Sequence, residues 1–229
     1  MSTHESGRPA AAIPLQTHLE KLRSRCEAAS RFQGGHTGYH EELRIFREYA
    51  SEANLYLPEP PAELNAPPDE EGNEHQVWYF PASDCYRKAT WPDFFGMLVI
   101  HRPGEEPKAS PIAYLDRWRL HNEIFGDAVE FLGALGTTQG LRMLIRQTAI
   151  AGTPATDMQI RAFFDESGWA PFEVGGHTAF FDPERTLVVS DTHRGNFVMM
   201  ADGLLAPIDL RIQEIDGSLL DAVRKLCGC

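Results

Sequence analysis

The chain has 229 residues, of which 42% are hydrophobic and 24% are charged, and its formal net charge at pH 7 is −12. This length allows one sizeable domain with an extension, or two small domains, and the composition is ordinary for a globular protein with a core. The acidic balance argues against a protein that binds bare nucleic acid, and no apolar run approaches the roughly 20 residues that span a bilayer. The first twelve residues lack a signal-peptide core and the four cysteines lack zinc-site spacing, so we expect a cytoplasmic protein with no membrane partner.

The N-terminal part of the chain predicts a helical extension. Residues 1–13 predict disorder, and apolar residues at helical spacing predict helices over Pro14–Arg31 and Tyr39–Tyr56. Pro58–Asp69 contains five prolines in twelve residues, which is typical of a stiff, extended linker. We therefore expect residues 1–68 to form a tail, two helices and a linker, residues 72–213 to form the main domain, and residues 214–229 to form a C-terminal tail.

The main domain begins with strand-like segments and continues with mixed elements. Strands are expected over Gln76–Phe80, Asp84–Ala89, Phe94–His101, Ala128–Leu135 and Leu141–Thr148, and again over His177–Phe181 and Thr186–Ser190. A helix is expected from the N-cap Ser110 to Phe125, ending at Gly126. A second helix is expected from the capping box of Thr156 and Gln159 to about Ser167, and a short one over Asp221–Leu226. Asp202-Gly203 predicts the turn of a hairpin between Asn196–Met200 and Leu204–Ile208. The mixture of hairpins and helices indicates an α+β fold.

Three polar residues near the C-terminus carry the clearest chemical signal. Asp191 follows the apolar run Leu187–Val189 and Ser190, Asn196 comes five residues later, and Asp209 comes thirteen residues after that. Kinase-type phosphoryl transfer needs these residue types, because one Asp takes the hydroxyl proton while an Asn and a second Asp hold magnesium on the phosphates. Each residue alone has a simpler explanation, as a turn cap, a loop residue or a salt-bridge partner of an arginine. The three together, with a hairpin between them, are more specific.

The ligand types favour magnesium over zinc. Magnesium prefers oxygen ligands and usually binds one or two carboxylates together with substrate phosphates. Zinc would need His or Cys, and His193 stands alone in its loop. His36 and His40 have a spacing that can suit zinc, but a solvated pair explains them more simply.

A lysine and a glutamate further upstream could complete a phosphate site. Strand alternation puts Lys88 on the same face as Tyr86. Glu123 lies on the helix that follows, and a strand lysine paired with a helix glutamate would be held against nucleotide phosphates. The alternatives are an exposed basic residue and a solvated helix carboxylate.

The stretch from about Gly72 to Ile212 resembles the kinase-like domain found in polyvalent proteins of phages and mobile elements, a compact relative of protein kinases. The matching segments are Gly72–Val77, Tyr86–Thr90, Tyr114-Leu115, Asn122–Asp127, Pro154–Asp157, Asp191–Phe197, Asp202-Gly203 and Pro207–Leu210. The resemblance implies a compact bilobal fold with a reduced C-terminal lobe, preceded here by the helical extension. It also implies the use of ATP and Mg²⁺.

The resemblance assigns a role to each candidate residue. It implies that Lys88 contacts phosphates, that Glu123 orients Lys88, and that Asp191 is the catalytic Asp. It makes Asn196 and Asp209 the metal ligands. The adenine pocket would be lined by the backbone of Gln147, Thr148, Ala149 and Ile150.

The sequence also departs from the protein-kinase pattern. It has no Gly-x-Gly-x-x-Gly loop, Ser190 stands where protein kinases place an Arg, and Leu210 and Arg211 replace the Phe and Gly of Asp-Phe-Gly. Only 20 residues follow Asp209, too few for both an activation segment and a helical peptide-binding lobe. Recognition of a protein substrate is therefore expected on another surface, with the helices of residues 14–56 as the candidate.

Three functions are consistent with these observations. The first is a phosphotransferase that moves the γ-phosphoryl group of ATP to a hydroxyl acceptor, expected to be on a protein. The second is a catalytically inactive nucleotide-binding or protein-interaction module, that is, a pseudokinase. The third is a small-molecule kinase of the aminoglycoside-phosphotransferase type, which shares the Asp-x4-Asn arrangement and the later Asp, and which an acidic acceptor pocket would favour.

Overall fold

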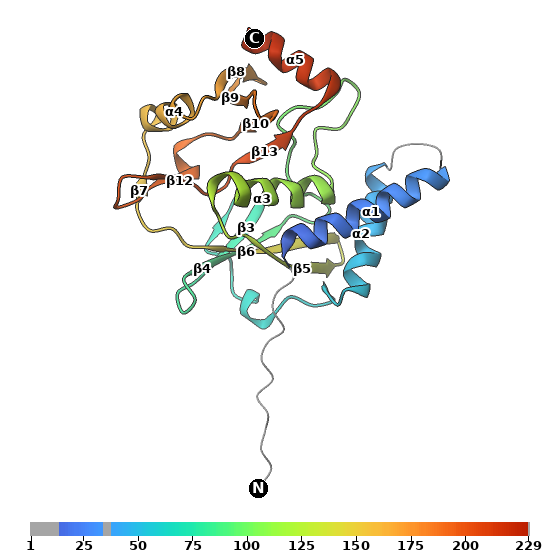
Figure 1. The fold of residues 1–229 in the computed structure, drawn as a ribbon. Coiled ribbons are helices and arrows are strands. Elements are labelled where there is room, and N and C mark those ends of the chain that lie inside the picture. Colours follow the sequence, from blue (N-terminus) through green and yellow to red (C-terminus); the bar gives the residue numbers. More distant parts are fainter. Residues whose placement is uncertain (1–13, 34–37, 229) are drawn as a thin grey trace.

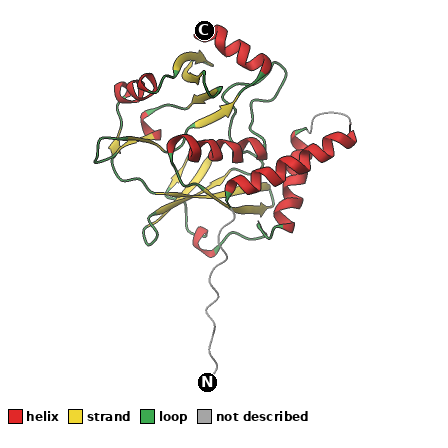
Figure 2. Cartoon of the chain, in the orientation of Figure 1, coloured by secondary structure: helices red, strands yellow, loops and turns green. Residues whose placement is uncertain are grey.

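The computed structural model of the chain describes residues 14–33 and 38–228, so the disorder expected for residues 1–13 lies outside the described residues, as does His36. The structure mixes helices and strands (Figures 1 and 2). The α-helices are α1 (Leu15–Gln33), α2 (Tyr39–Glu52), α3 (Pro111–Phe125), α4 (Asp157–Glu166) and α5 (Gly217–Cys227). Two short 3₁₀ turns are η1 (Ala62–Leu64) and η2 (Arg194–Asn196). No helix in these ranges is both long and apolar enough to cross a bilayer.

The strands form three sheets. The largest has the order β1-β5-β6-β4-β3-β2, with β1 (Tyr56–Leu57), β2 (Glu70–Glu71), β3 (His75–Phe80), β4 (Cys85–Thr90), β5 (Glu130–Thr137) and β6 (Gly140–Thr148). The second has the order β13-β10-β9-β8, with β8 (Ala170–Val174), β9 (His177–Asp182), β10 (Leu187–Ser190) and β13 (Arg211–Glu214). The third has the order β12-β11-β7, with β7 (Thr153–Pro154), β11 (Phe197–Met199) and β12 (Leu205–Pro207).

Helix α3 forms where its capping residues predict it. The Ser110 Oγ accepts a hydrogen bond from the amide of Ala113 at 3.2 Å, and Pro111 occupies the first turn, where its missing amide costs nothing. Gly126 ends the helix with a φ of 68°, which glycine adopts without a side-chain clash. The helix buries Tyr114 and Trp118 against the six-stranded sheet. This packing positions the middle of α3 over β5 and β6, and it brings the Trp118 ring within 5.2 Å of the Lys88 Nζ of β4.

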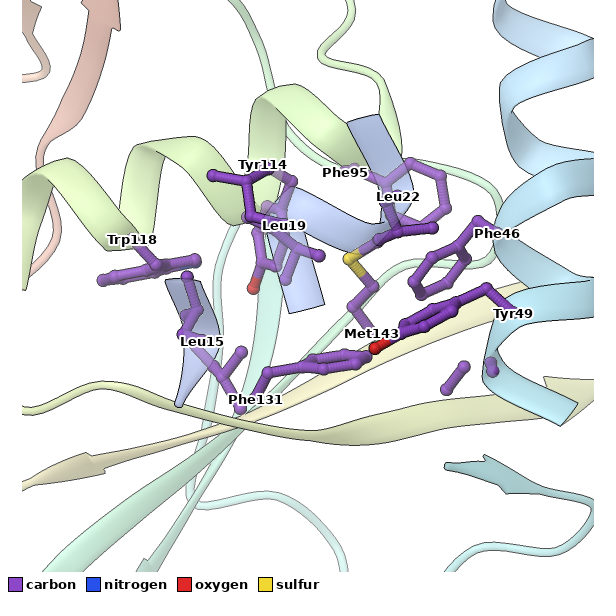
Figure 3. Close-up of a cluster of buried hydrophobic side chains, with 14 of the residues drawn as sticks. Leu15, Leu19, Leu22, Phe46, Tyr49, Phe95, Tyr114, Trp118, Phe131 and Met143 are labelled. Atoms are coloured by element: carbon purple, nitrogen blue, oxygen red, sulfur yellow. The ribbon is translucent and has the colours of Figure 1, made fainter. Parts of the chain in front are cut away.

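The N-terminal helices share the core of the six-stranded sheet. Figure 3 shows side chains of α1, α2 and α3 packed together with residues from β5 and β6 in one hydrophobic cluster. Its members include Leu19, Phe46, Trp118, Phe131 and Met143. The proline-rich segment therefore does not separate two hydrophobic cores. The division of the chain at residue 68 stays a prediction, and the shared core argues against it.

The remaining elements pack around the four-stranded sheet. On one face, α4 contributes Phe164, whose ring stacks on Phe180 of β9 with centroids 4.0 Å apart. On the other face, α5 packs Leu219 and Val223 against the sheet. The capping box of Thr156 and Gln159 that starts α4 is confirmed. Figure 1 shows this group of elements on the opposite side of α3 from the six-stranded sheet.

One predicted strand is wrong and five were missed, of which β1, β2 and β7 have two residues each. Phe94–His101 forms only isolated bridges, because Gly96 has a φ of 84° and the side chain of Gln213 accepts the amide hydrogens of Val99 and Ile100. Strands β8 and β13 were not predicted. Both are short, and β13 alternates charged or polar residues with a single isoleucine, so their pairing depends on neighbours distant in sequence.

Candidate active site

Two strand pairings bring the three polar residues near the C-terminus together. Antiparallel pairing of β10 with β13 sets Ser190 opposite Arg211, and pairing of β11 with β12 sets Phe197 opposite Pro207. Asp209 lies in the link between β12 and β13. The first pairing therefore brings Asp191 beside this link, and the second brings Asn196 beside it.

Asn196 joins the other two residues through their backbones. Its Nδ2 donates to the carbonyl oxygen of Asp191 at 2.8 Å and to that of Asp209 at 3.0 Å. The carbonyl of Asn196 also accepts the amide hydrogen of Ile208 at 2.9 Å. Because Nδ2 makes both side-chain bonds, Oδ1 is the atom of this side chain that could bind a cation.

Asp191 is the first residue after β10, and its φ is 64°. Aspartate tolerates this left-handed conformation better than most residues, and such strain is frequent at functional sites. The side chain is 32% exposed, and its Oδ2 lies 3.9 Å from the Nε of Arg211. Asp191 also lines a cavity of about 1310 Å³. The carboxylate is thus accessible from solvent on the side of this cavity.

Asp209 is surrounded by positive charge. Its Oδ1 lies 2.6 Å from Nη2 of Arg117, and its Oδ2 lies 3.4 Å from Nζ of Lys88. The Lys88 Nζ also donates to the carbonyl oxygen of Ile208 at 3.4 Å. Although burial by itself raises the pKa of Asp209, the charges of Lys88 and Arg117 hold that pKa well below its ordinary value. Asp209 is therefore a carboxylate at neutral pH, as a metal ligand must be.

Arg117 was not recognised from the sequence. It lies on α3, is only 5% exposed, and donates from Nη1 to Oε2 of Glu74 at 2.5 Å and from Nε to the carbonyl of Leu210 at 2.8 Å. Glu74 also accepts from Nε of Arg211 at 2.8 Å. Although burial by itself raises the pKa of Glu74, the charges of Arg117 and Arg211 bring it below its ordinary value. An available signal was the position of Arg117 three residues after Tyr114 and four before His121, on one face of the helix.

The structure does not form the expected ion pair between Lys88 and Glu123. Glu123 is 62% exposed and pairs with Arg119 of its own helix at 2.6 Å. The inward face of α3 instead carries Arg117 and His121, and Glu123 lies two residues beyond His121, where helical geometry turns it away. The prediction that Glu123 orients Lys88 is corrected, because the carboxylate paired with Lys88 is Asp209.

The segment expected to bind adenine lies at the end of β6. The side chain of Gln147 donates from Nε2 to the carbonyl of Ile208 at 2.8 Å and also to the carboxylate of Asp127. The amide of Ala149 is bonded to the carbonyl of Asp84 at 2.9 Å. Binding of adenine by Gln147, Thr148, Ala149 and Ile150 stays a prediction.

An aromatic pair adjoins this segment. Tyr86 of β4 stands opposite Gln147 in the sheet and on the same face as Lys88, and it is 36% exposed. Its ring lies 5.1 Å from the ring of Tyr79, measured between centroids. The Lys88 face of the sheet therefore ends in an exposed aromatic surface.

The residues present fit magnesium bound together with phosphates. The structure supplies an ionised carboxylate, Asp209, and an amide oxygen, Asn196 Oδ1. Among the described residues no group of three or more His, Cys, Asp or Glu side chains could hold a metal ion by itself. A cation here would complete its coordination with phosphate and water oxygens, as magnesium usually does.

Comparison with family models gives an independent result. The model described as "Serine/Threonine/Tyrosine Kinase found in polyvalent proteins" matches residues 39–214, which is most of the chain and begins at the first residue of α2. Comparison with curated proteins and with solved structures found no match. The family match confirms the resemblance seen in the sequence, and it includes the segments that carry Lys88, Arg117, Asp191, Asn196 and Asp209. The chain therefore belongs to the serine/threonine/tyrosine kinases found in polyvalent proteins.

Proposed function

We propose that the chain is an active phosphotransferase that moves the γ-phosphoryl group of ATP to a hydroxyl acceptor in a magnesium-dependent reaction. The observation that carries this proposal is the convergence of Lys88, Asp191, Asn196 and Asp209 from separate segments of the chain. The 3.4 Å distance between Lys88 Nζ and Asp209 Oδ2 is the observation that supports this convergence most directly. A lysine that contacts the phosphates and a carboxylate that holds their metal ion must lie near each other to act on one triphosphate.

Each residue has a defined part in the proposed reaction. Asp191 accepts the proton of the acceptor hydroxyl as its oxygen bonds to the γ-phosphorus, while the bond from that phosphorus to the bridging oxygen of ADP breaks. Lys88 stays next to the phosphates and offsets their negative charge. Magnesium, when bound, neutralises the charge that develops on the phosphate oxygens, and Asp209 and Asn196 are the residues that would hold it.

The arrangement of sheets supports a two-lobe interpretation of the fold. The six-stranded sheet with α1 to α3 corresponds in this proposal to one lobe, and the elements around the four-stranded sheet correspond to the other (Figure 1). Lys88 comes from the first group, and Asp191, Asn196 and Asp209 come from the second. The nucleotide would lie between them, with its base beside Tyr86 and Gln147.

The cavity beside Asp191 favours a polypeptide acceptor over a small molecule. Its volume of about 1310 Å³ is larger than the roughly 300–1,000 Å³ of most small-molecule pockets. Its charged lining residues are of both signs, namely Asp157, Glu173, Asp191, Arg161 and Arg211. This lining is not the acidic pocket that a cationic aminoglycoside would need. The lining contains no residue of α1 or α2, so we place acceptor binding here and not on residues 14–56.

Nucleotide binding and turnover test the proposal on the full chain. We expect a thermal shift with ATP and magnesium, and release of ADP when a serine-, threonine- and tyrosine-containing acceptor protein is added. Asp209→Ala should abolish magnesium-dependent turnover, whereas Asp202→Ala, in the exposed hairpin turn, should retain it. Normal turnover in Asp209→Ala would refute the metal assignment, and binding without any turnover would favour the pseudokinase.

A further inference from the structure

Arg117 is held in place independently of Asp209. The guanidinium bonds to the Glu74 carboxylate and to the carbonyl of Leu210 as well as to the Asp209 carboxylate. Glu74 is fixed in turn, since a Cβ added at Gly96 would lie 2.7 Å from its Oε2, and its Oε1 accepts from Arg211. Moving Arg117 away would leave a buried guanidinium without its partners, and it would remove one of the two cations that neutralise Glu74. Both changes cost free energy in a protein interior.

The two carboxylate oxygens of Asp209 are consequently not equivalent. Oδ1 is bonded to Arg117 at 2.6 Å, whereas the contacts of Oδ2 with Lys88 and with His75 Nδ1 are longer, at 3.4 and 3.8 Å. A divalent cation on Oδ1 would lie within a few ångströms of the buried guanidinium, and like charges at such separations repel strongly where the dielectric is low. Lys88 also carries a positive charge, but in the proposed function it contacts the phosphates, whereas Arg117 stays bonded to Oδ1. Oδ2 is therefore the oxygen of Asp209 that is left to bind a metal.

We propose that Arg117 restricts this site to one magnesium ion per nucleotide and supplies, as a fixed positive charge, the electrostatic contribution that a second ion would make. Protein kinases generally hold two magnesium ions with the corresponding Asp and Asn. Here Arg117 occupies one oxygen of Asp209, so Oδ2 and the amide oxygen of Asn196 serve a single ion. This inference rests on the proposed function of the site. Arg117 acts through Asp209 and is a positioning residue.

Counting bound metal tests this inference without relying on turnover. Mn²⁺, which can replace magnesium and is visible by electron paramagnetic resonance, would be titrated into the full chain with a non-hydrolysable ATP analogue. We expect one bound Mn²⁺ for each bound analogue. Two Mn²⁺ ions for each bound analogue would overturn the inference while leaving the proposed function standing. Binding of neither Mn²⁺ nor analogue would overturn both.

Matched variants identify Arg117 as the cause. Arg117→Gln keeps hydrogen-bonding groups near Glu74 and Asp209 but removes the charge, so the count should rise from one ion to two. Arg117→Lys retains the charge, so this variant should still bind one Mn²⁺ ion for each bound analogue. Arg211→Gln removes the other cation bound to Glu74 without touching Asp209, and it should also stay at one. A count of one in an Arg117→Gln protein that still binds the analogue would overturn the inference, and the wild-type count decides it if that variant does not fold.

Discussion

The two sides of the site are held together by different forces. On the side of β10 to β13, strand register and the amide of Asn196 hold Asp191 and Asp209, mostly through backbone atoms. On the side of β4 and α3, buried ion pairs join Lys88 and Arg117 to Asp209 and Glu74. The comparison teaches that the side chain of Asp191, a residue held through its backbone, can be replaced with little effect on the fold, whereas the second side depends on a balance of charge.

The largest expected effect comes from Asp191→Asn, which changes the chemistry of the first side and leaves its framework intact. The variant keeps the carbonyl that bonds to Asn196 but cannot accept the hydroxyl proton. Turnover should fall about 100-fold or more, in line with the contribution of a general base. Nucleotide affinity and melting temperature should change little, as measured by ATP titration and thermal unfolding. A large loss of stability would show that this side also depends on charge.

Glu74→Ala should destabilise the second side of the site by removing the carboxylate that pairs with Arg117 and Arg211. It leaves Arg117 without one of its carboxylate partners and Arg211 without its 2.8 Å partner in the interior, so the free energy of unfolding should fall by about 3–5 kcal/mol. Urea unfolding measures this loss.

Glu123→Gln is the matched control for Glu74→Ala. It removes only an exposed pair with Arg119, and it should change the free energy of unfolding by less than about 1 kcal/mol and leave turnover intact. A large loss of turnover in Glu123→Gln would contradict the correction and favour a role of Glu123 in orienting Lys88.

Tyr86→Ala sharpens the comparison by separating base binding from phosphate binding. Base–aromatic stacking contributes about 1–3 kcal/mol, so the affinity for ATP should fall about 5- to 150-fold. The affinity for magnesium tripolyphosphate, which has no base, should not change. Tyr86→Phe keeps the ring and should bind ATP normally. Equal losses of affinity for ATP and for tripolyphosphate would show that the base does not stack on Tyr86.

Glu42 offers the smallest effect and a contrast with Asp209, because it is a half-buried carboxylate that forms no ion pair with any residue the structure describes. Burial raises its pKa, and hydrogen bonds from Ser110 and from the Ile112 amide, the latter at 2.7 Å, oppose the rise only in part. The folded protein therefore holds this proton more tightly than the unfolded chain, so its contribution is most favourable below the unfolded pKa of about 4.3 and is lost as pH rises through the folded pKa.

Glu42→Gln should accordingly stabilise the protein more at about pH 7 than at about pH 4, as measured by urea unfolding at both values. Glu48→Gln, on the exposed side of α2, is the matched substitution for comparison. An equal effect of Glu42→Gln at both pH values would contradict the raised pKa.

The ends of α3 and one hairpin turn were predictable because their signals are local. Helix α3 begins after Ser110 and ends at Gly126, as expected. Asp202-Gly203 forms the turn of the hairpin that brings Asn196 to Asp209. The strand expected over Phe94–His101 did not form, in part because the amides of Val99 and Ile100 bond to the side chain of Gln213, more than a hundred residues away. Propensity describes a residue and its neighbours, and it carries no information about such a partner.

The sequence by itself determined the candidate residues of the first side, since Asp191, Asn196 and Asp209 lie within one short stretch whose strands pair locally. Only the tertiary structure decided that α3 turns Arg117 inward and Glu123 outward. Periodicity shows which residues of a helix share a face, but α3 has charged residues around much of its circumference. The choice depends on Glu74 and Asp209, 43 and 92 residues from Arg117, because an arginine can be buried only where distant carboxylates neutralise it.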